Sequence, residues 1–159
     1  MQDQLIKAIS SGFYGEWIHI DPKYAFIGLT PVNARKKPDG APHSCWELLY
    51  HIVIWQDAII RNIQGERLDW KEIEANDNWP TTESMKEDSN FNTLLDRFLT
   101  NVERAIKLLT NVDFLKTSKG FPELSTIKLF MVLLQHTSYH IGQIITVRQH
   151  LGDSPKPPS

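Results

Sequence analysis

The segment FNTLLDRFLTNVERAIKLL (residues 91–109) carries the strongest structural pattern in the sequence. Its apolar side chains recur at the spacing of an α-helix and form a single stripe along one face. The stripe consists of Phe91, Leu94, Leu95, Phe98, Val102, Ala105, Ile106 and Leu109. Just before it, the motif Ser84-Met85-Lys86-Glu87 predicts a capping box. Such a stripe has to be buried against other elements of the fold.

Two other segments show the same helical periodicity. Residues 44–64 begin with Ser44-Cys45-Trp46-Glu47, a second capping-box motif, and end at Gly65. Residues 125–150 form the longest pattern, which Gly152 ends. Both patterns are long enough, and apolar enough on one face, to predict core helices.

The sequence predicts an all-α fold, a four-helix bundle. Its first helix has an apolar face from Leu5 to Phe13, and Asp21-Pro22 predicts the start of a short additional helix. Strand signals are weak, so the main helices must bury their stripes against one another. Residues 65–83 form a long crossover between the second and third helices, which allows these two helices to point the same way.

Length and composition indicate one globular domain. The chain has 159 residues, of which 41% are hydrophobic and 23% charged. We assign residues 1–151 to the helical domain and residues 152–159, which contain three prolines, to a flexible tail. The net charge of −2 gives no electrostatic reason to bind nucleic acid.

The location predicted from the sequence is the cytoplasm. No apolar run approaches the ~20 residues of a membrane span, and the N-terminus lacks a secretory signal pattern. The single cysteine, Cys45, excludes an intramolecular disulfide and fits a reducing compartment. Cys45 could be a reactive thiol at a helix N-terminus, but a small buried residue is the favoured interpretation.

Three histidines form the candidate metal site. His136 and His140 are one helical turn apart and project from nearly the same face. His51 shares a stripe with Leu48 and Ile52 and should also point inward. Three neutral imidazoles would hold a divalent ion with a position left open, and zinc, nickel, copper and iron all accept such ligands.

The alternative is that these histidines are hydrogen-bonded core residues. A pair with this spacing also arises by chance, but burying three imidazoles without partners costs free energy. Other metal motifs are absent: Thr137 stands where a zinc protease helix needs glutamate, and only Glu16-Trp17-Ile18-His19 has the spacing of a di-iron bundle.

Two motifs together resemble the DinB-like (YfiT-like) family of helical metalloenzymes. They are HSCWELLYHIVIW (residues 43–55) and LLQHTSYHIGQI (residues 133–144), and the stretch from Gly15 to Asp39 also looks like that family. The family has an inward histidine followed four residues later by tryptophan, and an H-x-x-x-H-x-G-Q signature on its last helix. The matching residues here are His51, Trp55, His136, His140, Gly142 and Gln143. Ile141 replaces an arginine that many members carry.

The resemblance implies an up-down-down-up helix order, a homodimer, and a nickel or zinc ion on His51, His136 and His140. Characterised relatives include S-transferases and an isomerase that use low-molecular-weight thiols. We therefore expect a metal-dependent thiol transferase or hydrolase that acts on a small electrophilic molecule. A non-catalytic binding or stress-response module on the same scaffold is the alternative.

Residues near the predicted ligands have two interpretations each. Gln143 could orient a ligand or join two helices, and Trp55 could line the pocket or only fill the core. Glu47 could accept a hydrogen bond from His51, but we favour its capping role. His43 could carry protons at the mouth of the bundle, or it could be an exposed loop residue without a role. His19 and His150 are expected at the surface.

Overall fold

The all-α prediction is confirmed by the computed structural model, which describes residues 2–155 except for the side chain of Ser89. Within this range the chain forms no strand, and a single isolated bridge pairs Thr117 with Ser125. No helix in the described part combines the length and apolarity needed to cross a membrane. The elements are α1 (Gln2–Phe13), η1 (Pro22–Phe26), α2 (Pro31–Ala34), α3 (Cys45–Ile63), α4 (Trp70–Asn76), α5 (Asp88–Leu109) and α6 (Thr126–His150).

The ends of α3 and α6 lie where the sequence places them. Ser44 and Glu47 form the predicted capping box, with the Glu47 amide donating to Ser44 Oγ at 3.3 Å and the Ser44 amide to Glu47 Oε2 at 2.7 Å. Ser125 caps α6 through its hydroxyl. Gly65 and Gly152 follow the two helices with φ values of 99° and 74°, a backbone region that glycine enters without strain.

The predicted capping box before α5 is wrong. The helix begins at Asp88 after Glu87, which makes no side-chain capping bond. Ser84 is instead part of the preceding turn, where its hydroxyl donates to the carbonyl oxygen of Thr81 at 2.8 Å. Local hydrogen bonding by serine competes with capping, and here the turn takes the hydroxyl.

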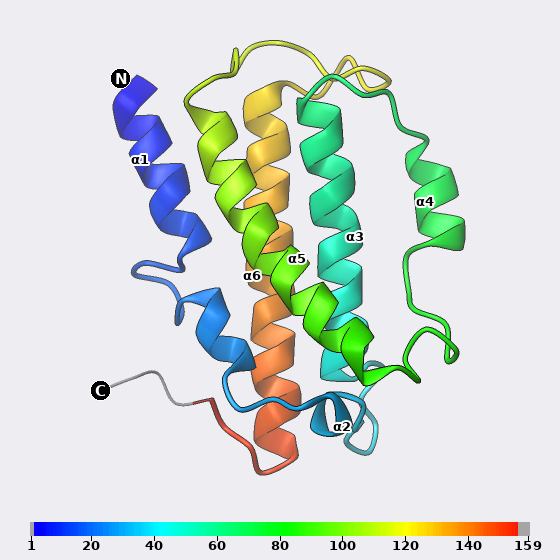
Figure 1. Ribbon diagram of the computed structural model, residues 1–159. Helices are drawn as coiled ribbons and strands as arrows, with labels where there is room; N and C mark the ends of the chain where they lie inside the picture. Colours follow the sequence, from blue (N-terminus) through cyan, green and yellow to red (C-terminus); the bar gives the residue numbers. More distant parts are fainter. Residues whose placement is uncertain (1, 156–159) are drawn as a thin grey trace.

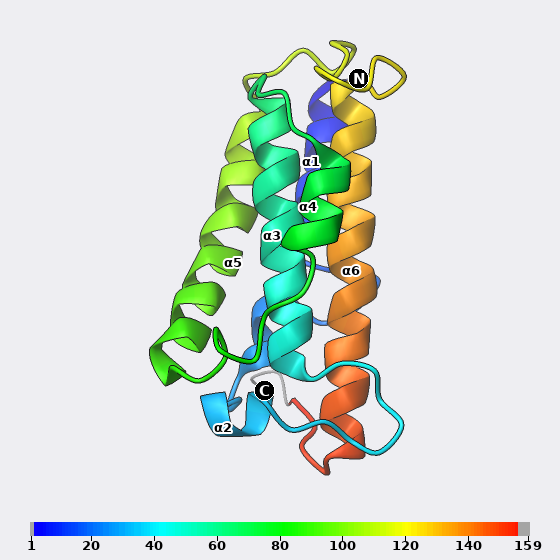
Figure 2. The ribbon, with the colours of Figure 1, turned by 90° about the vertical axis from the view of Figure 1, so that its right-hand side faces the viewer.

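Four helices carry most of the packing. α3 lies between α5 and α6, and α1 packs on α5 and α6 (Figures 1 and 2). In Figure 1, α3 and α5 both run upward, whereas α1 and α6 run downward. The crossover between α3 and α5 therefore returns along the length of α3, as its length predicts.

Two short helices were not predicted. α2 lies in the proline-rich loop before α3, and α4 lies in the crossover. Asp69 caps α4 by accepting from the amides of Lys71 and Glu72. Helices this short span too few turns to produce a clear hydrophobic period, so the sequence pattern did not reveal them.

The core is aromatic where α5 meets its neighbours. Phe98 packs on Phe26 of η1, and Phe91 packs on Trp46 of α3, each with ring centroids 5.2 Å apart. All but two members of the predicted α5 stripe are buried, and the other two, Leu95 and Ile106, are half-buried against the core. The stripe therefore faces the interior as its spacing predicts.

A buried arginine ties the C-terminal end of α6 to η1. Arg148 is only 2% exposed and donates to the carbonyl oxygens of Ala25 at 2.6 Å and Ile27 at 2.8 Å. It also pairs with the carboxylate of Asp153, so the first part of the predicted flexible tail is held in place. Residues 156–159 of that tail lie outside the described residues.

Replacing Arg148 should destabilise the fold strongly. We expect Arg148→Met to lower the free energy of unfolding by roughly 3 kcal/mol, because two buried carbonyl groups lose their donor. Urea denaturation measures this loss. Arg104→Met, at an exposed arginine, is the matched control and should stay within about 0.5 kcal/mol of wild type. Equal losses in the two variants would contradict a structural role for Arg148.

Candidate metal centre

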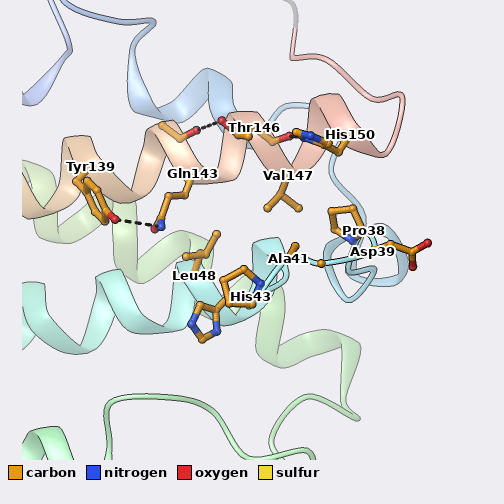
Figure 3. A pocket seen from close by; sticks show the side chains of 13 residues that line it. Pro38, Asp39, Ala41, His43, Leu48, Tyr139, Gln143, Thr146, Val147 and His150 are labelled. Atoms are coloured by element: carbon orange, nitrogen blue, oxygen red, sulfur yellow. Dashed lines mark hydrogen bonds between the residues drawn. The ribbon is translucent and has the colours of Figure 1, made fainter.

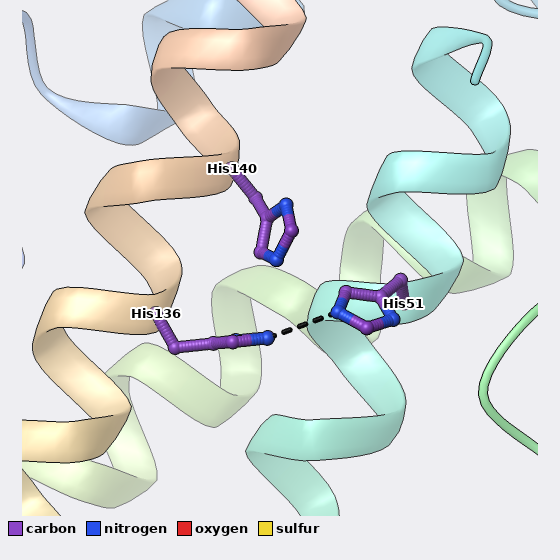
Figure 4. A group of neighbouring side chains, drawn as sticks. All are labelled: His51, His136 and His140. Carbon is purple, nitrogen blue, oxygen red and sulfur yellow. Dashed lines mark hydrogen bonds between the residues drawn. The ribbon is translucent and has the colours of Figure 1, made fainter. Parts of the chain in front are cut away.

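Three histidine rings meet between α3 and α6 (Figure 4). His51 comes from the middle of α3, and His136 and His140 lie one turn apart on α6. One nitrogen from each ring lies within 4.8 Å of the other two, and the Nε2 atoms of His51 and His136 are 3.0 Å apart. His51 and His140 are buried, and His136 is partly buried. The structure thus brings together the three residues that the sequence singles out.

Hydrogen bonds fix the tautomers of two of these rings. His51 Nδ1 lies 3.1 Å from the backbone oxygen of Asn78, and His140 Nδ1 lies 2.6 Å from Gln143 Oε1. Both partners are acceptors, so each Nδ1 must carry the proton. The Nε2 atoms of His51 and His140 then carry lone pairs, and that of His51 accepts a hydrogen bond from His136 Nε2 at 3.0 Å.

All three imidazoles are uncharged at neutral pH. Burial lowers the pKa of His136 to about 3, and the neighbouring His140 and His51 lower it further. Burial also lowers the pKa of His51 and of His140, although the hydrogen bonds to Asn78 and Gln143 act in the opposite direction. Neutral rings with inward lone pairs are the form of histidine that binds metal.

The donor set fits one divalent transition metal ion. Metal-bound histidines characteristically donate their second ring N–H to a carbonyl or carboxylate oxygen, as His51 and His140 do here. His136 Nδ1 is buried without a hydrogen-bond partner in the described structure, and this ring is held through its Nε2 atom, which hydrogen-bonds to His51 Nε2. His136 Nε2 is thus the ring nitrogen that faces His51 (Figure 4).

Sequence comparison agrees with this geometry. Residues 24–144 match the sequence model of the DinB superfamily. The chain belongs to the DinB superfamily. The matched range contains all three histidines and Gln143. No curated protein and no solved structure matched the chain.

In this superfamily member the crossover covers the histidine cluster. Trp79 stacks between two rings, 4.3 Å from His51 and 3.6 Å from His43 by centroid distance. Asn78 accepts from His51 through its backbone oxygen and from Trp55 Nε1 through Oδ1, the latter at 2.8 Å. Asn78 therefore links the crossover to the site, and no pattern in the sequence pointed to it.

Three residues predicted near the site have different outcomes. Gln143 Oε1 accepts a hydrogen bond from His140 Nδ1, a contact within α6 and not between two helices. Trp55 borders the cluster, with its ring centroid 6.4 Å from those of both His51 and His136. Glu47 does not serve His51: its carboxylate caps α3 and pairs with Lys37 at 3.1 Å, so only the favoured capping interpretation holds.

Two other histidines differ from their predicted setting. His19 is not a free surface residue, because it is half-buried and its Nε2 lies 3.0 Å from Ser138 Oγ on α6. His43 is half-buried against Trp79 rather than exposed in a loop. His150 is exposed, as expected. The contacts of His19 and His43 join segments that are distant in the sequence, so no local pattern could predict them.

Removing the acceptor on Gln143 should weaken metal binding. We expect Gln143→Leu to lower zinc affinity by about 10–100-fold, because His140 loses the partner that fixes its tautomer. Gln143→Glu keeps an acceptor at the same position and should bind zinc as tightly as wild type, or more tightly. Competition with a chromogenic chelator measures both affinities. An unchanged affinity in Gln143→Leu would show that this hydrogen bond does not support the site.

Proposed function

We propose that His51, His136 and His140 hold one nickel or zinc ion, and that the protein is a metal-dependent thiol transferase or hydrolase. Its substrate would be a small electrophilic molecule, with a low-molecular-weight thiol as co-substrate in the transferase case. The observation that carries the proposal is the convergence of three neutral imidazoles, two of them with tautomers that leave Nε2 unprotonated.

Each group at the site has a defined task under this proposal. A bound ion would supply Lewis acidity, which brings the pKa of a thiol or of water toward neutrality. The three histidines hold that ion and leave part of its coordination open, while Asn78 and Gln143 orient two of the rings. Trp79 covers one side of the cluster and limits the access of water.

The reacting thiol would come from outside the chain. Cys45 is fully buried, and its Sγ points to the backbone oxygen of Ile144 at 3.8 Å. Burial raises the pKa of Cys45 to about 12, so the thiolate is not available near neutral pH. This excludes the reactive-thiol interpretation of Cys45 and favours a diffusible thiol.

We extend the proposal to architecture and assembly. The four longest helices would form the up-down-down-up bundle, which the shared direction of α3 and α5 supports. A cytoplasmic homodimer would cover exposed apolar side chains such as Trp17 and Ile18, which are 97% and 75% exposed. Neither nucleic acid nor a membrane is among the proposed partners. Sedimentation equilibrium measures the assembly, and a monomer at all concentrations would contradict the dimer.

A thiol-consumption assay tests the proposed activity. Zinc-loaded or nickel-loaded protein would be mixed with chlorodinitrobenzene and either glutathione or bacillithiol, and free thiol followed over time. We expect metal-dependent thiol loss that disappears in metal-free protein and in His140→Ala. A metal-loaded protein that turns over none of a broad panel of electrophiles would favour the non-catalytic binding module instead.

A further inference from the structure

A cavity of about 640 Å³ lies next to the histidine cluster. One wall is the face of α6 from Tyr139 to His150, and the other is formed by the loop of residues 38–43 with Leu48 of α3 (Figure 3). The α6 wall continues the line that carries His136 and His140, one turn further along the helix. The cavity volume falls within the range of about 300–1,000 Å³ that is typical of small-molecule sites.

The cavity and the histidine cluster share their boundary. Gln143 lines the cavity and also accepts from His140 Nδ1. His43 lines the cavity and stacks on Trp79, whose other face covers His51. A molecule in the cavity would therefore have one end beside the proposed metal position.

The walls of the cavity are mainly apolar. Carbon atoms of Pro38, Pro42, Leu48 and Val147 lie on opposite sides, and the described residues that line the cavity include no lysine and no arginine. Asp39 supplies the one carboxylate among the lining residues of the described range, 2–155. Lys37, whose Nζ donates to the carbonyl oxygen of the lining residue Pro42 at 3.1 Å, is already paired with Glu47 at 3.1 Å. A carboxylate or sulfonate placed here would therefore lose its hydration without gaining an unpaired lysine or arginine from the lining.

We propose that this cavity binds the electrophilic substrate, and that the substrate is an uncharged, mainly apolar molecule. The inference rests on the proposed function for the reaction, but the binding site itself is argued from the walls alone. Thiol co-substrates such as glutathione carry carboxylates, so they do not match this cavity. The cavity therefore fits the apolar electrophile and not the thiol. The thiol must approach the histidine cluster from another side.

Gly142 offers a way to fill the cavity without disturbing the fold. It lines the cavity, and a Cβ added there would meet no atom within 4 Å, so no close packing against another helix requires a glycine at this position. Its backbone is helical, and both alanine and leucine are better helix formers than glycine. Gly142→Leu would place a branched side chain in the open space, and Gly142→Ala is the matched control.

A pair of fluorescent probes tests the proposal directly. N-phenyl-naphthylamine is uncharged, and anilinonaphthalene sulfonate has the same ring system with one added negative charge. Titrations would use the full chain, both metal-free and zinc-loaded. We expect saturable binding of the neutral probe at one site and at least about tenfold weaker binding of the sulfonate. Gly142→Leu should weaken the neutral probe at least about tenfold, whereas Gly142→Ala should change it by less than about twofold.

The outcomes separate this inference from the proposed metal function. Equal or tighter binding of the sulfonate, no binding of the neutral probe, or unchanged binding in Gly142→Leu would each overturn the inference. Probe binding that follows the expected pattern in a protein that holds no metal would support the cavity and contradict the metal function. If the protein binds metal but gives any of the overturning probe results, the metal function would be supported and the cavity inference contradicted.

Discussion

Alanine at position 136 is expected to lower zinc affinity by at least about 100-fold. Two histidines on different helices remain in His136→Ala, and two donors do not hold the ion against a competing chelator. The exposed His150 provides the matched control, because His150→Ala removes an imidazole from the same helix without touching the cluster. Chelator competition measures the three affinities. Comparable losses in both variants, or no loss in His136→Ala, would rule out His136 as a ligand.

The same position separates metal binding from fold stability. An apolar side chain of similar size removes the unpartnered His136 Nδ1, but it also removes the hydrogen bond between the Nε2 atoms of His136 and His51. These two effects oppose each other, so we expect the free energy of unfolding of His136→Leu in EDTA to stay within about 1 kcal/mol of wild type. It should also lose the stabilisation that zinc gives wild type, which is about 4 kcal/mol when free zinc is 1,000 times the dissociation constant. Thermal unfolding with and without zinc shows both effects, and a metal-induced shift that persists in His136→Leu would contradict them.

The metal-free protein should lose stability as the pH falls from about 6.5. The folded chain lowers the pKa of all three clustered histidines, so protons bind the unfolded chain first. The stabilisation is complete above the unfolded pKa of about 6.5 and is lost progressively toward the folded value of His136, about 3. Protonation linked to His136 alone should lower the free energy of unfolding by about 2 to 3 kcal/mol between pH 6.5 and 4.5.

Urea denaturation in EDTA at several pH values between 7 and 4.5 measures this dependence. His136→Leu should show a shallower slope, because it lacks one of the groups that titrate only after unfolding. A flat profile for wild type over this range would contradict the burial of neutral histidines. The lowered pKa values also revise the sequence-based expectation for metal release: protons compete for the folded ligands at a lower pH than the unperturbed value of about 6.5 suggests.

Much of the fold follows from long sequence patterns. The stripe from Phe91 to Leu109 spans several turns, so chance matches are rare and the buried face is correctly predicted. The capping box at Ser44 is local chemistry that the structure retains, whereas the one predicted at Ser84 gives way to a turn. Local signals are reliable only where no competing hydrogen bond exists nearby.

The histidine cluster could be predicted because each helix presents its side chains at a fixed period. His136 and His140 share a face by spacing alone, and His51 shares the apolar stripe of α3. The crossover residues that cover the cluster could not be predicted in this way. Asn78 and Trp79 lie in the crossover, where position is set by long-range contacts with His51 and His43 rather than by any local repeat.

Arg148 shows a second limit of sequence reasoning. A basic residue in the last turn of a helix is commonly explained by favourable interaction with the helix dipole. Here the side chain is instead buried and binds two carbonyl oxygens of the η1 region, more than 100 residues away in the sequence. Only the packing of η1 against α6 reveals that this arginine is structural.

Elemental analysis of the native protein tests the central claim most directly. The protein would be purified without added metal and without a histidine tag, and its transition-metal content measured per chain. The convergence of His51, His136 and His140 predicts close to one equivalent of nickel or zinc. A content below about a tenth of an equivalent, in protein that also fails to take up either ion on addition, would contradict the account.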